Sequence, residues 1–337
     1  MKLSEIAKAV AAVSSNHAIL IYGPPKSGKT RLAGQSAKIA EIKNVYFFSL
    51  ENGHETLIHE CGLTEEEMDK VTVYKIQDTT DEPIAVETML KAMSSRNDIK
   101  ICDTHGRVDC AICTKAKRSF TPFNLSKCTH SDIVIIDTGT KLGDSALAGT
   151  MIGRDSMAKP GWDEFGIQGK WLTDILSVVE QAVFTNFIVT CHALFEKDDD
   201  GTEKVFPLMG TRPFSLRVAG KFGTVVYLDK KLNKHVGGSS STYRGNVLTG
   251  SRVGAKLEAA KEINIRSILV DTGIIRPGQI EEVSVKDPIN PDKKEEVVSQ
   301  EQVVMQDPKG DAKPMGLAAM IAKKKAEALA RKEAEKV

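Results

Sequence analysis

The stretch "IYGPPKSGKT", residues 21–30, decides how the chain folds, because residues 23–30 carry the spacing G-x-x-x-x-G-K-T. An apolar run of strand type, "AILIY" (18–22), precedes it, and "RLAGQSAKIAEI" (31–42) follows with small and apolar residues at helical spacing. A glycine-rich turn between a strand and a helix is the context that a phosphate-binding P-loop requires. The sequence therefore predicts that this turn binds the phosphates of a nucleotide.

The residues of the turn suit a nucleoside triphosphate and its metal ion. Pro24 and Pro25 have no N–H group, so the amides of residues 26–30 must form the phosphate cradle, at a helix N-terminus whose dipole favours an anion. Lys29 is expected to reach the β- and γ-phosphates, and the Thr30 hydroxyl to bind Mg²⁺. We therefore expect ATP and Mg²⁺ as cofactors, with the nucleotide held by Gly23, Lys26, Ser27, Gly28, Lys29 and Thr30.

Length and composition narrow the remaining possibilities. The 337 residues suffice for one large domain or two small ones. The 46 basic and 45 acidic residues nearly cancel, so any nucleic-acid site must be a local patch. Residues 1–15 do not read as a signal peptide, since Glu5 and Lys8 interrupt the apolar run, and no apolar run is long enough to span a membrane. We expect a cytoplasmic protein whose six cysteines stay reduced, as metal ligands or buried thiols.

Strand-like and helix-like runs alternate as far as residue 250 or so, which is the pattern of a parallel α/β sheet flanked by helices. The predicted strands are 18–22, 44–50, 71–76, 132–137, 186–192 and 223–229, and helices are predicted at 82–95 and 169–183. The predicted parts are an ATPase core at 1–255, a Cys/His-rich insert within it at 98–131, a C-terminal extension at 256–275, and a charged linker and helical tail at 276–337. The tail is either a flexible charged segment or a helix that is solvated or depends on a partner.

Polar residues at the ends of predicted strands complete the nucleotide site. Asp137 ends an apolar run and would hold Mg²⁺ through water. In one large class of P-loop ATPases a glutamate directly follows this aspartate, but here the next residue is Thr138. Glu51, at the end of the strand after the P-loop helix, is therefore the expected base for the attacking water, unless it only caps that strand. Thr190 and His192 end another strand, where a polar side chain would sense the γ-phosphate, although a buried core histidine is the alternative.

The order of these elements resembles the RecA/DnaB class of ATPases. More closely, residues 15 to about 255 resemble the short, core-only RecA-like ATPases of bacteriophages, a group that includes single-strand annealing recombinases. The likeness is carried by "IYGPPKSGKT", by "SLENG" (49–53) and by the stretch from "CHALFEK" to "VVYL" (191–228). It implies a RecA-like P-loop NTPase core with a mainly parallel sheet.

The resemblance also implies roles for individual residues. Lys29 and Thr30 would bind nucleotide and Mg²⁺, Glu51 would activate water, Asp137 would support the metal, and His192 would be the sensor. The activity implied is ATP hydrolysis that drives work on single-stranded DNA, in phage recombination, annealing or repair in the host cytoplasm. A homo-oligomer is the expected form, and a single-strand-binding protein is a further expected partner.

In the RecA class the loops after the aspartate strand and after the sensor strand face DNA, and here they are residues 140–168 and 194–221. Single strands need positive charge interleaved with stacking rings. These loops and their flanks offer Lys159, Lys170, Lys204, Arg212, Arg217 and Lys221, with Trp162, Phe165, Phe206 and Phe214. The same loops carry the acidic residues Asp155, Asp163, Glu164 and "EKDDDGTE" (196–203), which would repel phosphate. The loops are therefore either a DNA-binding surface or ordinary solvated loops.

A basic side chain from a neighbouring subunit is expected to reach the γ-phosphate, as an arginine finger does in other NTPases. The stretch "STYRGNVLTGSRVGAK" (241–256) follows the last predicted core strands and offers Arg244, Arg252 and Lys256. We favour Arg252, because Gly250 and Gly254 flank it and would let an exposed loop present it. The alternative is a hairpin with solvated charges.

The insert at 98–131 stands where a RecA-like core needs only a short link. The segments "CDTHG" and "CAIC" both have the two-residue gap that lets a tight turn direct two ligands at one Zn²⁺. The favoured ligands are Cys102, His105, Cys110 and Cys113, and the competing set replaces the first pair by Cys128 and His130. The alternative is a loop of reduced thiols, but the insert is too polar to fold on a core of its own, so some cross-link must order it.

Two other functions are compatible with a P-loop. A small-molecule kinase would need an acceptor pocket and an Arg-rich lid, and the sequence has no such lid. A nucleotide-dependent switch without DNA activity would position a partner through the charged tail. DNA-stimulated ATP hydrolysis distinguishes a DNA-handling ATPase from both.

Overall fold

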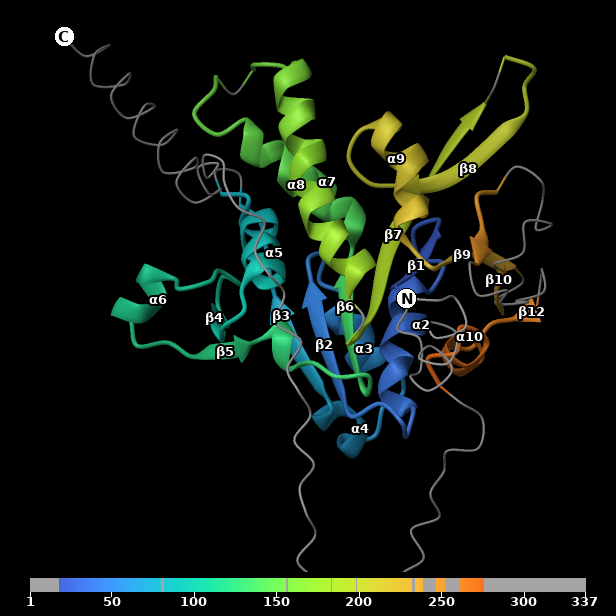
Figure 1. The fold of residues 1–337 in the computed structure, drawn as a ribbon, viewed down its shortest axis with the longest axis horizontal. Helices are drawn as coiled ribbons and strands as arrows, with labels where there is room; N and C mark the ends of the chain where they lie inside the picture. The colour runs from blue at the N-terminus through green and yellow to red at the C-terminus, as the bar shows by residue number, and fades with distance from the viewer. Residues whose placement is uncertain are drawn as a thin grey trace, which may run out of the picture.

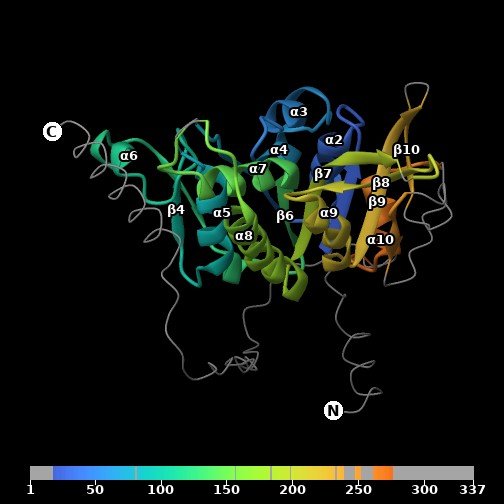
Figure 2. The ribbon, with the colours of Figure 1, turned by 90° about the horizontal axis from the view of Figure 1, so that it is seen from above.

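A mainly parallel sheet lies at the centre of the computed structural model, which describes residues 18–79, 82–155, 157–182, 184–197, 199–231, 234–238, 247–251 and 261–275. Within those ranges the sheet has ten strands, and helices cover both of its faces (Figures 1 and 2). The α/β fold that the sequence predicts is therefore confirmed. The predicted linker and tail at 276–337 lie outside the described residues, as do residues 1–17 of the predicted core.

The strand order brings the P-loop strand to the middle of the sheet. In order, the strands are β12 (Lys261–Glu262), β10 (Lys234–Gly238), β9 (Thr224–Lys231), β1 (Ala18–Gly23), β7 (Asn186–Lys197), β6 (Asp132–Asp137), β2 (Asn44–Ser49) and β3 (Val71–Lys75). Every neighbouring pair from β9 to β3 is parallel. The antiparallel additions are β10 and β12, β8 (Glu203–Leu208) on β7, and β11 (Gly250–Ser251) on β9. The parallel order places the carboxyl ends of β1, β7, β6 and β2 at one edge, where ligands bind in open α/β sheets.

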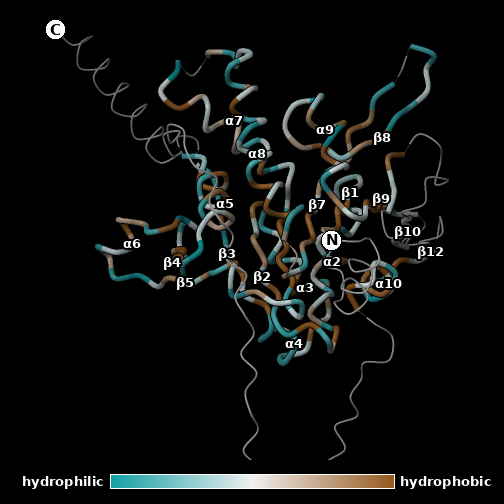
Figure 3. Tube along the Cα trace, viewed as in Figure 1, coloured by the Kyte–Doolittle hydropathy of each residue, from teal (hydrophilic) through white to brown (hydrophobic). Residues whose placement is uncertain are grey.

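The central strands form because their apolar runs can be buried on both sides. Every residue of β1 and of β6 is buried. Ile19 and Ile21 belong to the core on one face of the sheet, and Leu20 and Tyr22 belong to the core on the other. A continuous apolar run is the expected pattern of a strand covered on both faces. Figure 3 shows this apolar colouring along the central strands, with hydrophilic residues in the peripheral loops.

Helices on the two faces bury these cores. One face carries α5 (Ile84–Ser94), α7 (Gly139–Thr150) and α8 (Trp162–Gln181), and the other carries α2 (Lys29–Gly34), α3 (His54–His59) and α10 (Ile265–Asp271). Shorter elements are η1 (Gln35–Lys38), α4 (Glu65–Asp69), η2 (Leu125–Lys127), α9 (Arg212–Val218) and η3 (Ala219–Lys221). Ile268 and Leu269 of α10 are fully buried, so the described part of the predicted C-terminal extension packs on the core. None of the described helices is long and apolar enough to cross a membrane.

The two segments predicted as DNA-facing loops contain more regular structure than expected. Most of 140–168 is helical, because the Thr138 side chain accepts from the Lys141 amide (3.1 Å) at the start of α7, and the Glu164 carboxylate accepts from the Gly161 amide (2.9 Å) at the start of α8. The helix predicted at 169–183 is thus only the later part of α8. In the second segment, β7 continues to Lys197 and forms a hairpin with β8, which α9 follows.

The Cys/His-rich insert is a small unit at the side of the sheet, beyond β3 (Figure 1). It consists of β4 (Ile99–Cys102), α6 (Ala111–Lys115) and β5 (Phe120–Phe123), with β4 and β5 antiparallel. At its base the Phe123 ring lies 5.0 Å from that of Phe48 and 5.6 Å from that of Tyr74, between ring centroids. The Tyr74 hydroxyl donates to the carbonyl oxygen of Pro122 (2.8 Å). Aromatic packing therefore anchors the base of the insert on β2 and β3.

Candidate active site

The glycine-rich turn connects β1 to α2 at the carboxyl edge of the sheet. Lys26 (φ 62°) and Gly28 (φ 90°) adopt the left-handed conformation, which bends the backbone sharply before α2 begins. Gly23 serves close packing, because a Cβ atom there would collide with the carbonyl oxygen of Leu228 in β9. The turn thus has the strand–turn–helix setting that the sequence predicts.

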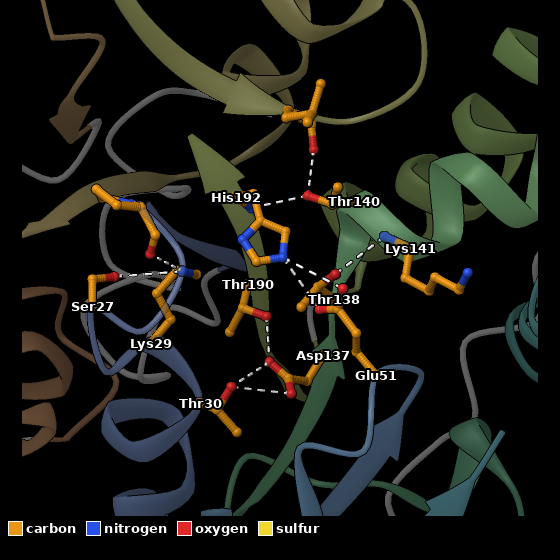
Figure 4. A network of polar contacts seen from close by, with 12 residues as sticks. Ser27, Lys29, Thr30, Glu51, Asp137, Thr138, Thr140, Lys141, Thr190 and His192 are labelled. Carbon is orange, nitrogen blue, oxygen red and sulfur yellow. Dashed lines mark hydrogen bonds and ion pairs between the residues drawn. The ribbon is translucent and has the colours of Figure 1, made fainter. Parts of the chain in front are cut away.

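Lys29, the first residue of α2, lies beneath the turn with 5% of its surface exposed. Its Nζ donates to the carbonyl oxygens of Gly23 (3.1 Å) and Pro24 (2.7 Å) and lies 3.4 Å from Ser27 Oγ (Figure 4). Burial lowers the pKa of the ammonium to about 8, and the Asp137 carboxylate offsets part of that shift. The negative charge of a triphosphate would stabilise the protonated form of this lysine.

Thr30 and Asp137 meet where α2 begins and β6 ends. The Thr30 hydroxyl lies 3.0 and 3.1 Å from the two carboxylate oxygens of Asp137, and the Thr190 hydroxyl of β7 donates to Oδ1 (2.5 Å) (Figure 4). Burial raises the pKa of Asp137, and these two hydrogen bonds lower it in part. A hydroxyl and a carboxylate side by side next to a phosphate-binding turn are oxygen ligands of the kind that Mg²⁺ prefers, so the residues fit this ion.

Glu51, which follows β2, faces His192, which lies within β7 where the end of β1 pairs with it (Figure 4). His192 Nε2 lies 3.3 Å from Glu51 Oε2 and 3.4 Å from Oε1. The hydrogen bond from His192 is the main cause that lowers the pKa of Glu51, and the charges of His192 and Lys141 add to it. The Glu51 side chain is 42% exposed, so water reaches it. Glu51 is therefore an ionised, accessible carboxylate beside the P-loop, as a base for water must be.

Thr140, in the first turn of α7, connects His192 of β7 to β8. The His192 amide donates to Thr140 Oγ1 (2.9 Å), and the Thr140 hydroxyl donates to the carbonyl oxygen of Leu208 in β8 (2.7 Å). No sequence motif assigns a role to Thr140. Its signal was a third polar residue in "DTGT", directly after the buried strand that ends in Asp137.

An open polar hollow of about 320 Å³ adjoins Glu51. Its lining consists of Leu50, Glu51, Asn52, Gln77, Asp78 and Lys141. The Gln77 side-chain amide donates to Asn52 Oδ1 (2.5 Å), and Asn52 adopts a left-handed backbone (φ 59°). The sequence predictions gave no role to Asn52, Gln77 or Lys141. Asn52 belongs to "SLENG", whereas Gln77 and Lys141 belong to no motif, and the three meet only through the order of β2, β3 and β6.

The structure brings most of the predicted nucleotide-site residues together at one edge of the sheet. These are Gly23, Lys26, Ser27, Gly28, Lys29, Thr30, Glu51, Asp137 and His192. The predicted finger Arg252, and the other candidates Arg244 and Lys256, lie outside the described residues. Their roles remain predictions.

The residues predicted to contact DNA differ in exposure and in charge pairing. Phe206 is only 3% exposed and therefore cannot stack on a base. Lys170, Arg212 and Lys221 each form an ion pair, with Asp174, Glu196 and Glu180 respectively, at 2.7 to 2.8 Å. Glu164 is buried and pairs with Arg154, so its charge is compensated. In contrast, Met157, between α7 and α8, is 86% exposed, and Trp162, the first residue of α8, is 93% exposed.

Four possible metal ligands of the insert converge on one point. Cys102, His105, Cys110 and Cys113 place their ligand atoms within 4.8 Å of one another. His105 Nδ1 lies 3.8, 3.4 and 3.3 Å from the Sγ atoms of Cys102, Cys110 and Cys113. Cys128 lies apart from this group, with its Sγ directed at the carbonyl oxygen of Asn124 (3.6 Å). The favoured ligand set is thus assembled, and within the described part of the chain the competing set is not.

The fold and the site define an α/β nucleotide-binding protein with a P-loop, in which acidic residues lie at the ends of neighbouring strands. A family model described as an AAA domain matches residues 15–253, and the chain belongs to this family. No curated protein matches the chain.

Several solved structures are distantly similar to this chain. The RadB recombinase is 15% identical, with a TM-score of 0.36 over 69% of this chain and 84% of that one. A prototypical ATPase from the type III secretion system of pathogenic bacteria is 16% identical, with a TM-score of 0.41 over 78% of this chain and 65% of that one. The ATP synthase subunit NeqB from Nanoarcheaum equitans is 14% identical, with a TM-score of 0.39 over 64% and 47%. These likenesses are too distant to carry a functional argument.

Proposed function

We propose that the protein binds ATP with Mg²⁺ at the P-loop and hydrolyses it, with Glu51 as the base. One observation carries this proposal: Lys29 and Thr30 of α2, Asp137 of β6 and Glu51 after β2 come from three segments and converge at one edge of the sheet, next to the glycine-rich turn. Each of these residue types is what phosphoryl transfer to water needs at that place.

The residues divide the work as follows. Lys29 and the amides of residues 26–30 hold the β- and γ-phosphates, and Thr30 and Asp137 hold the metal. Mg²⁺, when bound, supplies positive charge that offsets the charge building up on the phosphates. The Glu51 carboxylate, whose pKa is lowered, orients the attacking water and accepts its proton. His192 holds Glu51 in place through its Nε2.

A small-molecule kinase is the second candidate, because the polar hollow beside Glu51 could take an acceptor. Incubation of the purified protein with ATP and Mg²⁺ distinguishes an ATPase from a kinase and from a nucleotide switch. Release of inorganic phosphate without any acceptor supports the ATPase. Turnover that requires an added acceptor would support the kinase, and binding without turnover would support a nucleotide switch.

We further propose that ATP hydrolysis drives work on single-stranded DNA, in recombination, annealing or repair. The sequence resemblance to phage RecA-like ATPases supports this process, together with a cytoplasmic homo-oligomer and a single-strand-binding protein as partner. The exposed ring of Trp162, at the start of α8, supports the DNA contact, because exposed Met157 and Lys159 precede it in the segment between α7 and α8. α7 begins directly after Asp137 and Thr138 and ends at Thr150, so it leads from the active site to the segment that precedes Trp162.

The DNA proposal is tested with a fluorescent single-stranded oligonucleotide and Trp162→Ala. Loss of one stacking ring should weaken binding by about 5- to 150-fold. Ile112→Ala is the matched control, because Ile112 is also strongly exposed (63%) but lies on the insert. Equal affinity of wild type and Trp162→Ala would remove Trp162 from the DNA contact.

We also propose that the insert binds one Zn²⁺ through Cys102, His105, Cys110 and Cys113. Tetrahedral Zn²⁺ with Zn–S of about 2.3 Å and Zn–N of about 2.0 Å implies N···S edges of about 3.5 Å and S···S edges of about 3.8 Å. The three N···S distances of 3.3, 3.4 and 3.8 Å agree with such a tetrahedron. Four protein ligands leave no open position, which is typical of a structural rather than a catalytic zinc.

A further inference from the structure

The turn that carries His105 lies against the strand end that leads to the active site. Gly106 adopts a left-handed backbone (φ +68°), and a Cβ atom there would collide with the carbonyl oxygen of Lys75 and come within 2.6 Å of Ile76 Cα. The Thr88 hydroxyl of α5 donates to the carbonyl oxygen of Gly106 (2.8 Å) in the protein interior. Gly106 is therefore wedged between the end of β3 and α5 without room for a side chain.

The residue after Gly106 holds the turn in that place. Arg107 Nη1 donates to Glu82 Oε1 (3.2 Å), and Arg107 Nε lies 3.8 Å from Glu87 Oε2. Within the turn, the Gly106 amide donates to the carbonyl oxygen of Cys102 (2.9 Å), and the Cys102 amide donates to that of Arg107 (3.0 Å). The segment from Cys102 to Arg107 is thus a closed turn, with two of the proposed metal ligands inside it.

The end of β3 in turn holds the loop that carries Glu51. The Ile76 amide donates to the carbonyl oxygen of Ser49 at the end of β2 (2.9 Å). The next residue, Gln77, donates its side-chain amide to Asn52, the neighbour of Glu51 (2.5 Å). β3 pairs with β2 on one side, and among the described residues no strand pairs with its other side. The insert turn therefore supports the edge of the sheet at the point where another strand would otherwise do so.

We propose that the turn His105–Arg107, held by the insert's metal site, positions Glu51 for hydrolysis through Ile76, Gln77 and Asn52. Gly106 and Gln77 are positioning residues in this account, because neither touches the nucleotide. The inference rests on the proposed roles of Glu51 and of Zn²⁺. Since the supported loop follows β2 while Lys29 and Thr30 lie on α2, the support should affect turnover and leave nucleotide affinity unchanged.

Gly106→Ala tests the support while all four proposed zinc ligands remain. The added methyl group must push the turn away from Lys75 and Ile76. We expect kcat to fall by about 10- to 100-fold, as displacement of a catalytic group by about 1 Å does, with the Kd for ATP and the zinc content unchanged. Gly201→Ala is the matched control: Gly201 has a similar backbone (φ +79°), but a Cβ atom there meets nothing within 4 Å. A wild-type kcat in a folded, zinc-loaded Gly106→Ala protein overturns the proposal.

Gln77→Ala tests the positioning of Glu51 independently. It also serves as the test if Gly106→Ala fails to fold. Gln77 is exposed, so its truncation removes the bond to Asn52 without disturbing the core. We expect a lower kcat at unchanged Kd for ATP, and no change in Gln181→Ala, which truncates an exposed glutamine at the end of α8. An unchanged kcat in Gln77→Ala overturns the proposed route.

Cys113→Ser tests whether the proposed zinc contributes to the positioning of Glu51. It should release the zinc and lower kcat with the Kd for ATP unchanged. A metal-free, folded variant with wild-type kcat would show that the metal does not contribute to the positioning of Glu51.

Failure of this inference differs from failure of the proposed function. If Glu51→Gln slows hydrolysis while Gly106→Ala and Gln77→Ala do not, only the positioning role is wrong. If Glu51→Gln leaves hydrolysis unchanged, the proposed base is wrong.

Discussion

The nucleotide site and the Cys/His insert differ in what holds their functional side chains in place. The P-loop follows the fully buried strand β1 and Asp137 ends the fully buried strand β6, so the packing that forms the sheet also sets their positions. The insert has two four-residue strands, a five-residue helix and a small cluster of Cys102, Cys110, Cys113 and Phe120 at its outer end. Substitutions in the nucleotide site should therefore change chemistry, and loss of a proposed zinc ligand should first change local folding.

Lys29→Ala should have the largest effect, because it removes the buried ammonium that would meet the β- and γ-phosphates. Loss of one partner of a buried, hydrogen-bonded charge pair predicts ATP binding weaker by about 10³-fold, measured by titration calorimetry. Lys26→Ala is the control, since Lys26 is exposed and its expected contribution comes from its main-chain amide. Wild-type affinity in Lys29→Ala would show that ATP does not bind at this turn.

Glu51→Gln should follow, with a kcat lower by about 10²- to 10⁴-fold and the Kd for ATP unchanged. The amide keeps the shape of the side chain but cannot accept the proton of the attacking water. Glu55→Gln is the comparison, because Glu55 is an exposed carboxylate four residues further along the chain. Steady-state phosphate release separates the outcomes, and a loss of kcat in Glu55→Gln alone would move the role of base to that residue.

The proposed zinc site should respond differently from the nucleotide site. Metal analysis of protein purified without chelator should find one zinc per chain. Cys110→Ser should lose the metal, because three ligands bind Zn²⁺ much more weakly than four. Cys128→Ser should keep it, because Cys128 Sγ lies outside the cluster. Loss of zinc in both variants would favour the competing ligand set, and a metal-free wild type that is fully folded would contradict a structural zinc.

A smaller effect concerns protons taken up on binding. The pKa of Lys29 without nucleotide is about 8, so at pH 9 most molecules lack the proton, whereas the bound phosphates favour the charged ammonium. ATP binding should therefore take up a proton at pH 9, and affinity should fall by up to about tenfold per pH unit above pH 8. Calorimetry in buffers of different ionisation enthalpy measures the uptake. Lys29→Arg should show none, since arginine stays charged, and equal uptake in both proteins would assign the proton to another group.

The sequence predicts the sheet well because its strands are continuous apolar runs between turns, and the observed β1, β2, β3, β6, β7 and β9 overlap the predicted ranges. The sequence predicts secondary structure less well where a capping residue starts a helix. Thr138 and Glu164 cap the starts of α7 and α8, where the sequence predicts a loop. Contacts such as Gln77 to Asn52 and Gly106 to Ile76 depend on strand order and on how the insert docks, which no local pattern encodes. Phe206 shows the same dependence on tertiary packing. It belongs to a charged segment of the sequence, but its ring lies in the core.

The rate of phosphate release from ATP and Mg²⁺, with and without excess single-stranded DNA, tests the central claim most directly. The account predicts hydrolysis by the protein alone, through Glu51 beside the P-loop, and a higher rate with DNA because α7 leads from the active site to the segment that precedes Trp162. The Trp162→Ala protein should keep the rate without DNA and lose the increase. An absence of phosphate release under both conditions, from protein that binds ATP, would contradict the assignment as an ATPase.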